Sequence, residues 1–318
     1  MSGARSTRIT RAIVLRGGKG TGKGTFANVF GKLFGRHHLQ ISNAKHLVGN
    51  FNSHLKDCVC LFADEAFFAG DKQHEGVLKA LITEDVIPIE HKGLDLEQYP
   101  NYVHLIMASN DPHVIRATGD ERRYMVLDMG EEHKQDTAYF EKIWNQMENG
   151  GYEALLYFLQ SYDISEFNVR KVPQTEALRD QKMLSMSQDE EWWYQKLLNG
   201  RVLEKHAEWM RFVPSSEVER DFTDYAEKWR FNRRGNATQL GKFLSRVCPH
   251  IQKSQRRMMV EEPGPDGRPE EKSRRVYVYD FGSLQECRIA WNRLFGETEW
   301  DDPVEAEEEP ETQDEVPF

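Results

Sequence analysis

The first half of the chain alternates short runs of consecutive apolar residues with segments of helical periodicity. Uninterrupted apolar runs of this length are typical of parallel strands that are covered on both faces. The pattern predicts strands at residues 12–15, 59–63, 103–108 and 124–127, with a helix over residues 25–34. Helices broken at Gly150 and Gly151 are predicted over residues 139–161. We therefore expect an α/β core with a mainly parallel sheet over residues 1–160, followed by a connector over residues 161–188.

The pattern changes after residue 188. Helices are predicted over residues 189–198, 216–229 and 236–247, followed by a hairpin of residues 253–260 and 274–281 and a last helix over 283–295. Ser216 and Glu219 have the spacing of a capping box at the start of the second of these helices. Helices followed by a two-stranded ribbon predict a winged-helix-like α+β domain over residues 189–296.

The composition is that of a globular protein. Charged residues make up 30% of the 318 residues and hydrophobic residues 39%, which is enough for two domains with a sizeable core. No apolar run approaches the roughly 20 residues needed to span a bilayer, and the basic N-terminus lacks the apolar stretch of a signal peptide. The four cysteines have no zinc-binding spacing and are expected to be reduced thiols. We therefore expect a cytoplasmic protein with no membrane partner.

Charge is distributed unevenly along the chain. The formal net charge is -10, but residues 297–318 hold 11 acidic residues and no Lys or Arg, so 42 basic residues face 41 acidic ones in the remainder. We predict that this acidic tail is disordered. Residues 228–257 carry nine Lys or Arg and no Asp or Glu, a pattern that favours contact with nucleic acid. The residues predicted to contact duplex DNA are Arg233, Arg234, Lys242 and Arg246.

A glycine-rich stretch follows the first predicted strand and opens a helix, which is the context of a phosphate-binding loop. It matches the pattern G-x-x-x-x-G-K-[ST] from Gly17 to Lys23, but Gly24 stands where Ser or Thr is expected, so Thr25 is the nearest hydroxyl for Mg²⁺. Backbone N–H groups of such a loop cradle phosphates, and the lysine reaches the β and γ oxygens. The residues predicted to bind ATP are Gly17, Gly18, Lys19, Gly20, Thr21, Gly22, Lys23, Gly24 and Thr25.

Two further strand ends carry polar residues suited to ATP hydrolysis. Asp64 and Glu65 follow the second predicted strand, and we expect Asp64 to help hold Mg²⁺ with Thr25 while Glu65 polarises the attacking water. Asn110 follows the third strand and is expected to orient that water. The loop is also compatible with a nucleotide kinase, but the second carboxylate favours hydrolysis over transfer to a nucleotide.

Two basic elements complete the set of candidates. Arg122 and Arg123 precede the fourth strand, and either is a candidate finger for the γ-phosphate of a neighbouring subunit, the alternative being a local ion pair with Glu121. His91 and Lys92 lie near the tip of a hairpin predicted from residues 86–89 and 94–99. A basic tip suits contact with a nucleic acid backbone in the channel of a ring, the alternative being a surface hairpin with a solvated lysine.

The order GGKGTGKG, LFADEA, ITEDVIPIEHKG, LIMASN and DERRYMVLD resembles the superfamily 3 helicase module of phage and plasmid primase-helicases, which belongs to the AAA+ ATPases. The resemblance covers about residues 13–127, and the stretch that follows, to about residue 184, is also similar. It implies that Lys23 is the Walker A lysine, that Asp64 and Glu65 form Walker B, and that Asn110 is the sensor of motif C.

The same resemblance implies roles for the basic elements. Arg122 or Arg123 matches the arginine finger, and His91 and Lys92 match the DNA-tracking hairpin. Members of the family form hexameric rings, bind ATP between subunits and move 3′ to 5′ on single-stranded DNA. They carry a helical collar, and often a primase domain, ahead of the phosphate loop. Because little sequence precedes the loop here, we expect a fragment or a stand-alone ATPase, with any primase on a separate chain.

The sequence thus predicts an ATP hydrolase with Mg²⁺ that acts as a DNA helicase or translocase in phage or mobile-element replication, in the cytoplasm of a bacterial host cell. It is expected to bind single-stranded and duplex DNA and to form a homo-oligomer. One alternative is a DNA-binding AAA+ ATPase that loads or regulates a replisome, or acts in defence, without unwinding. A nucleotide kinase is a less favoured alternative.

Overall fold

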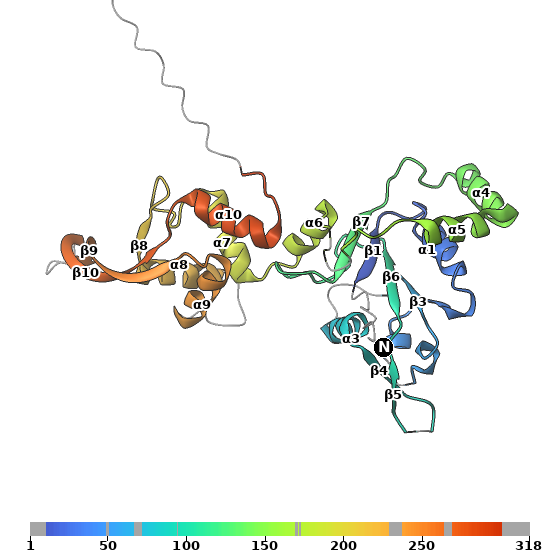
Figure 1. Ribbon diagram of the computed structural model, residues 1–318. Helices are drawn as coiled ribbons and strands as arrows, with labels where there is room; N and C mark the ends of the chain where they lie inside the picture. The colour runs from blue at the N-terminus through green and yellow to red at the C-terminus, as the bar shows by residue number, and fades with distance from the viewer. Residues whose placement is uncertain are drawn as a thin grey trace, which may run out of the picture. The chain divides into compact units, whose positions relative to one another are not determined.

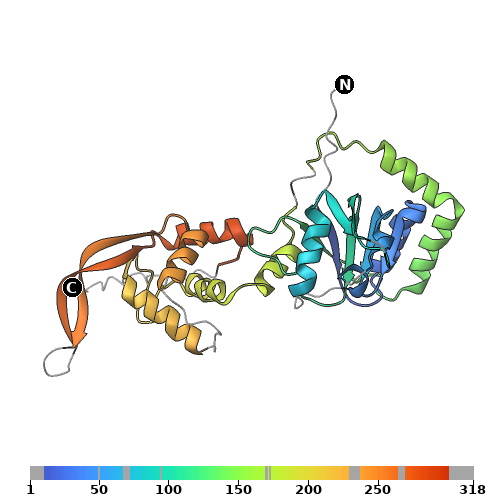
Figure 2. The same ribbon diagram turned by 90° about the horizontal axis from the view of Figure 1, so that it is seen from below.

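The computed structural model describes residues 11–48, 51–66, 72–93, 95–168, 171, 173–228, 237–263 and 269–300 (Figures 1 and 2). The chain divides into two compact units, Met1–Met186 and Ser187–Phe318. Arg233, Arg234, the predicted turn of the second hairpin and the acidic tail from residue 301 onward lie outside the described residues. Within the described part of the chain, no helix is both long and apolar enough to span a bilayer.

The first unit is built on a five-stranded parallel sheet. Its strands are β1 (Ala12–Arg16), β2 (His38–Ile41), β3 (Cys60–Asp64), β6 (His104–Ser109) and β7 (Tyr124–Asp128), in the order β2-β3-β6-β1-β7. The predicted α/β core with a parallel sheet is therefore confirmed. The sequence did not predict β2, because this edge strand has only one buried side chain, that of Ile41, and so lacks a continuous apolar run.

Helices cover both faces of the sheet, as the continuous apolar runs require. One face packs against α3 (Lys72–Thr83), and the other against α1 (Lys23–Lys32), with α3 and α1 on opposite sides of the strands in Figure 2. Along β3, Leu61 and Ala63 face the first layer, whereas Cys60 and Phe62 face the second. A short helix, α2 (Lys45–Val48), follows β2.

Residues 161–188 are not only a connector, because they contain α6 (Glu176–Leu184), which packs on the sheet of the first unit. Ala177 and Leu178 are buried in its core, and the Thr175 hydroxyl donates to the Val126 carbonyl of β7 at 2.6 Å. The predicted connector therefore supplies part of the core. The sequence did not predict this role of α6, because the helix is mostly polar and only a narrow stripe of it is apolar.

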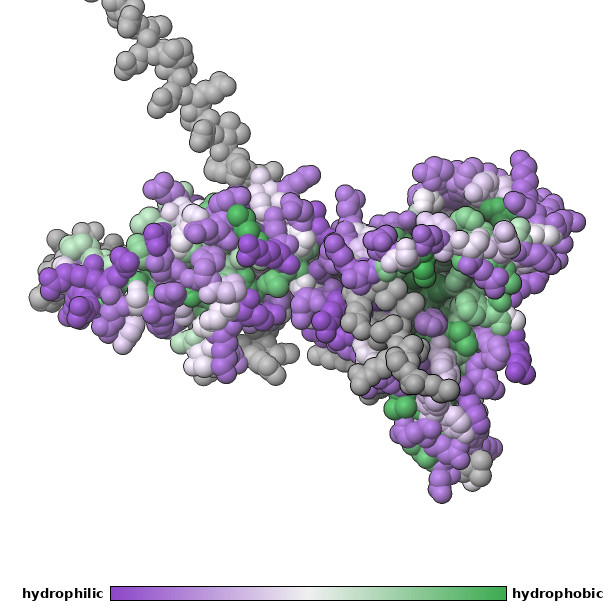
Figure 3. Space-filling view, in the orientation of Figure 1, coloured by the Kyte–Doolittle hydropathy of each residue, from purple (hydrophilic) through white to green (hydrophobic). Residues whose placement is uncertain are grey.

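Two additions project from the sheet. A hairpin of β4 (Val86–Ile89) and β5 (Glu97–Pro100) lies between α3 and β6, close to the predicted residues (Figure 1). Helices α4 (Thr137–Gln146) and α5 (Tyr152–Ser161) are separated by a break where Gly150 has φ 92°, as the sequence predicted. Neither helix contains a fully buried residue, and apolar surface gathers around α1 and α5 in the space-filling view (Figure 3).

The second unit has the winged-helix-like order that the sequence predicted. It consists of α7 (Gln188–Leu198), β8 (Phe212–Pro214), α8 (Ser215–Lys228), α9 (Ala237–Val247), β9 (Gln252–Pro263), β10 (Pro269–Asp280) and α10 (Leu284–Phe295). The strands form an antiparallel sheet in the order β8-β10-β9. The three-residue β8 was not predicted because it is too short to show a pattern.

Details of the helices in this unit differ from the prediction. Ser216 lies inside α8 rather than at its N-cap, because the helix begins directly after β8, so the capping box predicted there is wrong. Capping boxes are present instead at Ser187 of α7 and Ser283 of α10. Packing continues to Trp300, whose ring lies 5.9 Å from that of Tyr194, beyond residue 297 where the tail was expected to begin.

We expect Leu178→Ala to destabilise the first unit by about 2–5 kcal/mol, because it leaves a cavity beneath α6. Leu184→Ala on the same helix is the matched control, since Leu184 is 52% exposed and its truncation should change stability little. Hydrogen exchange of the β1 and β7 amides measures the stability of this unit alone. Equal protection in the two variants would show that α6 does not belong to the core.

Candidate nucleotide-binding site

Three neighbouring strands end at the same edge of the sheet. Because β3, β6 and β1 are parallel and adjacent, their carboxyl ends bring together Asp64 with Glu65, Asn110 and the glycine loop. These residues line a pocket of about 790 Å³. The structure therefore unites residues that lie as far apart as Lys19 and Asn110 in the sequence.

Lys23 ties the loop to the strand that ends in Asn110. Its ammonium donates to the carbonyls of Gly17 at 2.6 Å and Gly18 at 2.8 Å, and to Oδ1 of Asn110 at 2.8 Å. Burial lowers the pKa of Lys23, while the nearby carboxylates of Glu65 and Asp64 oppose that shift. The cation is thus held inside the pocket, at the first residue of α1.

The loop leaves backbone N–H groups for an anion. Gly22 is the N-cap residue of α1, and no side chain caps this helix end. Its φ of 92° lies in the left-handed region, and a β-carbon there would come within 2.8 Å of Cε1 of Phe140. By contrast, a β-carbon at Gly24 would meet nothing within 4 Å, so packing does not explain why Ser or Thr is absent at this position.

Asp64 and Glu65 occupy different environments. Burial, and next the charge of Glu65, raise the pKa of Asp64, whose Oδ2 accepts from Nε2 of Gln40 at 3.3 Å. Glu65 has a φ of 52°, a left-handed conformation that costs a non-glycine residue about 1–2 kcal/mol. Its N–H donates to the Ala108 carbonyl at 2.9 Å, and the Ser109 hydroxyl donates to Oε2 at 3.2 Å. Strain of this kind gathers at functional sites.

Arg16 and Gln181 support the site although the sequence analysis did not single them out. Arg16, just ahead of the loop, donates to Asp128 at 2.6 Å and to Asp180 of α6 at 2.7 Å. The buried amide of Gln181 donates to the Pro112 carbonyl at 2.6 Å and accepts the N–H of Val114 at 2.8 Å. Both residues fix segments next to Gly17 and Asn110. An arginine directly before the loop was a visible signal, whereas Gln181 had none.

The predicted arginine fingers lie at the opposite edge of the sheet. In the register of β7 with β1, Tyr124 pairs with Ala12 and Asp128 with Arg16, so Arg123 and Arg122 lie about six and seven residues, or roughly 20 Å, from the start of the loop. They do not reach the pocket of their own chain. Arg123 pairs with the buried Glu121 at 3.1 Å, the local ion pair that was the alternative reading, whereas Arg122 is exposed.

His91 and Lys92 follow β4, and Lys92 is exposed. Asn52 fixes the end of β4 next to the tip, because its amide donates to the Pro88 carbonyl at 2.8 Å and accepts the N–H of Glu90 at 2.8 Å. The hairpin leads into the amino end of β6, away from the pocket. Sequence reasoning missed Asn52, because a lone asparagine in a loop carries no distinctive pattern.

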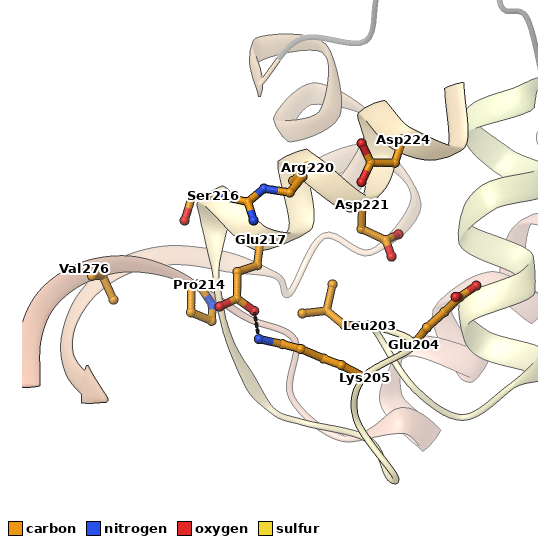
Figure 4. A pocket seen from close by; sticks show the side chains of 10 residues that line it. All are labelled: Leu203, Glu204, Lys205, Pro214, Ser216, Glu217, Arg220, Asp221, Asp224 and Val276. Atoms are coloured by element: carbon orange, nitrogen blue, oxygen red, sulfur yellow. Dashed lines mark ion pairs between the residues drawn. The ribbon is translucent and has the colours of Figure 1, made fainter. Parts of the chain in front are cut away.

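In the second unit, the four apolar positions of α9 are buried and Lys242 is exposed. Arg246 is 56% exposed, but its guanidinium pairs with Glu190 at 2.8 Å. A separate pocket of about 440 Å³ is lined on α8 by Glu217, Asp221 and Asp224, and Figure 4 shows Glu217 paired with Lys205. Arg220 of α8 lines the same pocket, and Asp221 pairs with Lys196 at 2.6 Å.

Comparison with known proteins supports the fold. A family model described as "Family of unknown function (DUF5906)" matches residues 15–123, the stretch from the end of β1 to Arg123. No curated protein matches the chain. A solved structure entitled "The apo structure of NrS-1 C terminal region (305-718)" superposes with a TM-score of 0.59 at 16% identity, covering 86% of this chain and 68% of that chain.

Two further structures, described as A-form apo structures of the same NrS-1 region, are similar. One has a TM-score of 0.59 at 18% identity and the other 0.57 at 16%, each covering 86% of this chain and 67% of that chain. At this identity the likeness concerns the fold. The parallel sheet with its glycine loop, followed by a small antiparallel α+β unit, is consistent with a P-loop nucleoside triphosphatase.

We expect Glu65→Gly to be about 1 kcal/mol more stable than Glu65→Ala, because only glycine adopts the left-handed conformation without steric cost. Both variants lack the carboxylate, so their difference isolates the backbone strain. Hydrogen exchange of the β3 and β6 amides provides the measurement. An alanine variant at least as stable as the glycine variant would mean that residue 65 is not strained.

Proposed function

We propose that the chain is an ATP-dependent DNA helicase or translocase of the superfamily 3, AAA+ type. The observation that carries the proposal is the meeting of Lys23, the Asp64–Glu65 pair and Asn110 in one pocket at three parallel strand ends. This set supplies a cation for the phosphates, a ligand for a metal, a base for water and an amide to orient it.

The residues of the pocket fit ATP with Mg²⁺. Mg²⁺ prefers oxygen ligands, and Thr25 and Asp64, which both line the pocket, would hold it and let it neutralise phosphate charge. The Lys23 ammonium, now bonded to loop carbonyls and Asn110, would turn to the β and γ oxygens. Asn110 would then orient a water whose proton Glu65 accepts. A nucleotide kinase is less well supported, because it has no use for the second carboxylate.

The finger would act between subunits. Because Arg122 lies at the edge of the sheet opposite to the pocket, it serves a γ-phosphate only when presented to another copy of the chain. Arg122 is the better candidate, since Arg123 is engaged by Glu121. A head-to-tail interface of this kind forms a ring when the rotation between successive subunits closes, and the family resemblance implies such a ring, a hexamer.

The hairpin supports translocation on single-stranded DNA. Lys92 is exposed just beyond the end of β4 that Asn52 fixes, so its ammonium can bind a phosphate while the hairpin moves with the core. For duplex DNA we propose α9 and the β9–β10 hairpin, where Lys242 and Arg257 are exposed. A replisome loader or regulator, or a defence ATPase, would share the proposed duplex-binding surface without needing the hairpin that carries Lys92.

We expect Arg122→Ala to abolish most ATP turnover while ATP binding survives, and mixing it with Lys23→Ala protein to restore activity. Roughly one quarter of random interfaces in an equal mixture would pair an intact loop with an intact finger. Glu65→Gln provides the control, because it also disables the pocket and keeps the finger. Its mixture with Arg122→Ala should not exceed the same quarter of intact interfaces. A site shared between subunits would be contradicted if the mixture showed no rescue and ATP turnover per chain did not depend on protein concentration.

Lys92→Ala should leave basal ATPase within about twofold of wild type and remove its stimulation by single-stranded DNA, together with unwinding of a forked substrate. Duplex binding should persist, because the proposed duplex surface is in the other unit. Lys142→Ala, an exposed lysine on α4, is the matched control. Normal unwinding by Lys92→Ala would exclude the hairpin from translocation, and a wild type that binds duplex DNA but never unwinds would favour the loader.

A further inference from the structure

The pocket is larger than the phosphate-binding elements alone. Besides the loop and the strand ends, it is lined by Gln135, Thr137, Phe140, Glu141 and Trp144, which belong to α4 and the turn before it. A volume of about 790 Å³ suits a whole drug-sized ligand. Helix α4 therefore supplies a second wall, to which the sequence analysis gave no chemical role.

Contacts at both ends hold α4 against the glycine loop and α1. At its start, the Gln135 N–H donates to the Gly20 carbonyl at 2.9 Å, and the Phe140 ring approaches Gly22. Beyond its end, Lys32 of α1 pairs with Glu148 at 3.0 Å and lies 4.3 Å from the centre of the Tyr152 ring. In both ribbon views α4 lies on the same side of the sheet as α1 (Figures 1 and 2).

Phe140 and Trp144 share one face of α4, because residues four apart are neighbours on a helix. Both are half-buried and line the pocket. Phe140 packs on the loop, whereas Trp144 lies about 6 Å further along the axis, one turn beyond the phosphate-binding residues. A flat apolar ring at this position can stack against the base, which is the uncharged part of a nucleotide.

We propose that α4 forms the base subsite of the pocket, with the Trp144 ring as the platform on which the nucleobase stacks. The inference rests on the proposed function and adds the part of the substrate that the loop does not recognise. Stacking tolerates every base, because each has a π-face. The subsite therefore distinguishes a nucleoside triphosphate from inorganic triphosphate, and not one base from another.

The test uses the full chain with Mg²⁺ and two probes, a non-hydrolysed ATP analogue and inorganic tripolyphosphate, titrated by calorimetry. Trp144→Ala should bind the analogue about 5- to 150-fold more weakly and tripolyphosphate as wild type does. Trp144→Phe should restore most of the affinity for the analogue, since it keeps an aromatic face. In steady-state kinetics Trp144→Ala should raise KM for ATP with little change in kcat.

Fluorescence gives an independent readout, because Trp144 is the only tryptophan in residues 1–186. A change on adding the analogue should occur in the wild type and be lost in Trp144→Phe while binding persists. Equal weakening of both probes by Trp144→Ala, or of neither, overturns the subsite. A wild type that binds tripolyphosphate as well as the analogue also overturns it, whereas one that binds neither overturns the proposed function and the subsite together.

Discussion

The hydrogen bond between the Lys23 ammonium and Asn110 joins two segments that the sequence separates by a whole succession of strands and helices. It forms because β1 and β6 are adjacent and parallel, so the loop after one strand and the asparagine after the other emerge side by side. The next strand, β3, adds Asp64 and Glu65 at the same edge. A parallel sheet thus concentrates polar strand ends while its interior remains apolar.

The same parallel arrangement keeps Arg122 away. Residues that precede a strand lie at the amino edge, so an arginine ahead of β7 faces away from the pocket of its own chain. A finger at this edge is useful only to another copy, which makes the proposed catalysis a property of an assembly. The pairing of Arg123 with buried Glu121 fixes the backbone that presents Arg122, since Glu121 also accepts the N–H of Arg122 at 2.9 Å.

Polar side chains of α6 fix two segments that border the pocket. Asp180 holds Arg16 at the mouth of the loop, and the buried amide of Gln181 bonds the segment that follows Asn110. A buried amide that satisfies both its donor and its acceptor specifies one arrangement, because any other leaves polar groups unpaired. Three residues separate the end of α6 from the start of α7.

Local sequence determined the four strands β1, β3, β6 and β7, the glycine loop, the broken helix at Gly150 and the buried face of α9, because each depends on a repeating pattern or on a residue with special backbone freedom. Tertiary structure decided what lacks such a pattern. The edge strand β2 and the polar helix α6 are positioned by the elements that they pack against. The contacts of Asn52 and Gln181 likewise depend on segments far away in the sequence. The position of α4 beside the loop, and the edge at which Arg122 lies, follow from strand order and register, and these are set by packing between segments far apart in the chain.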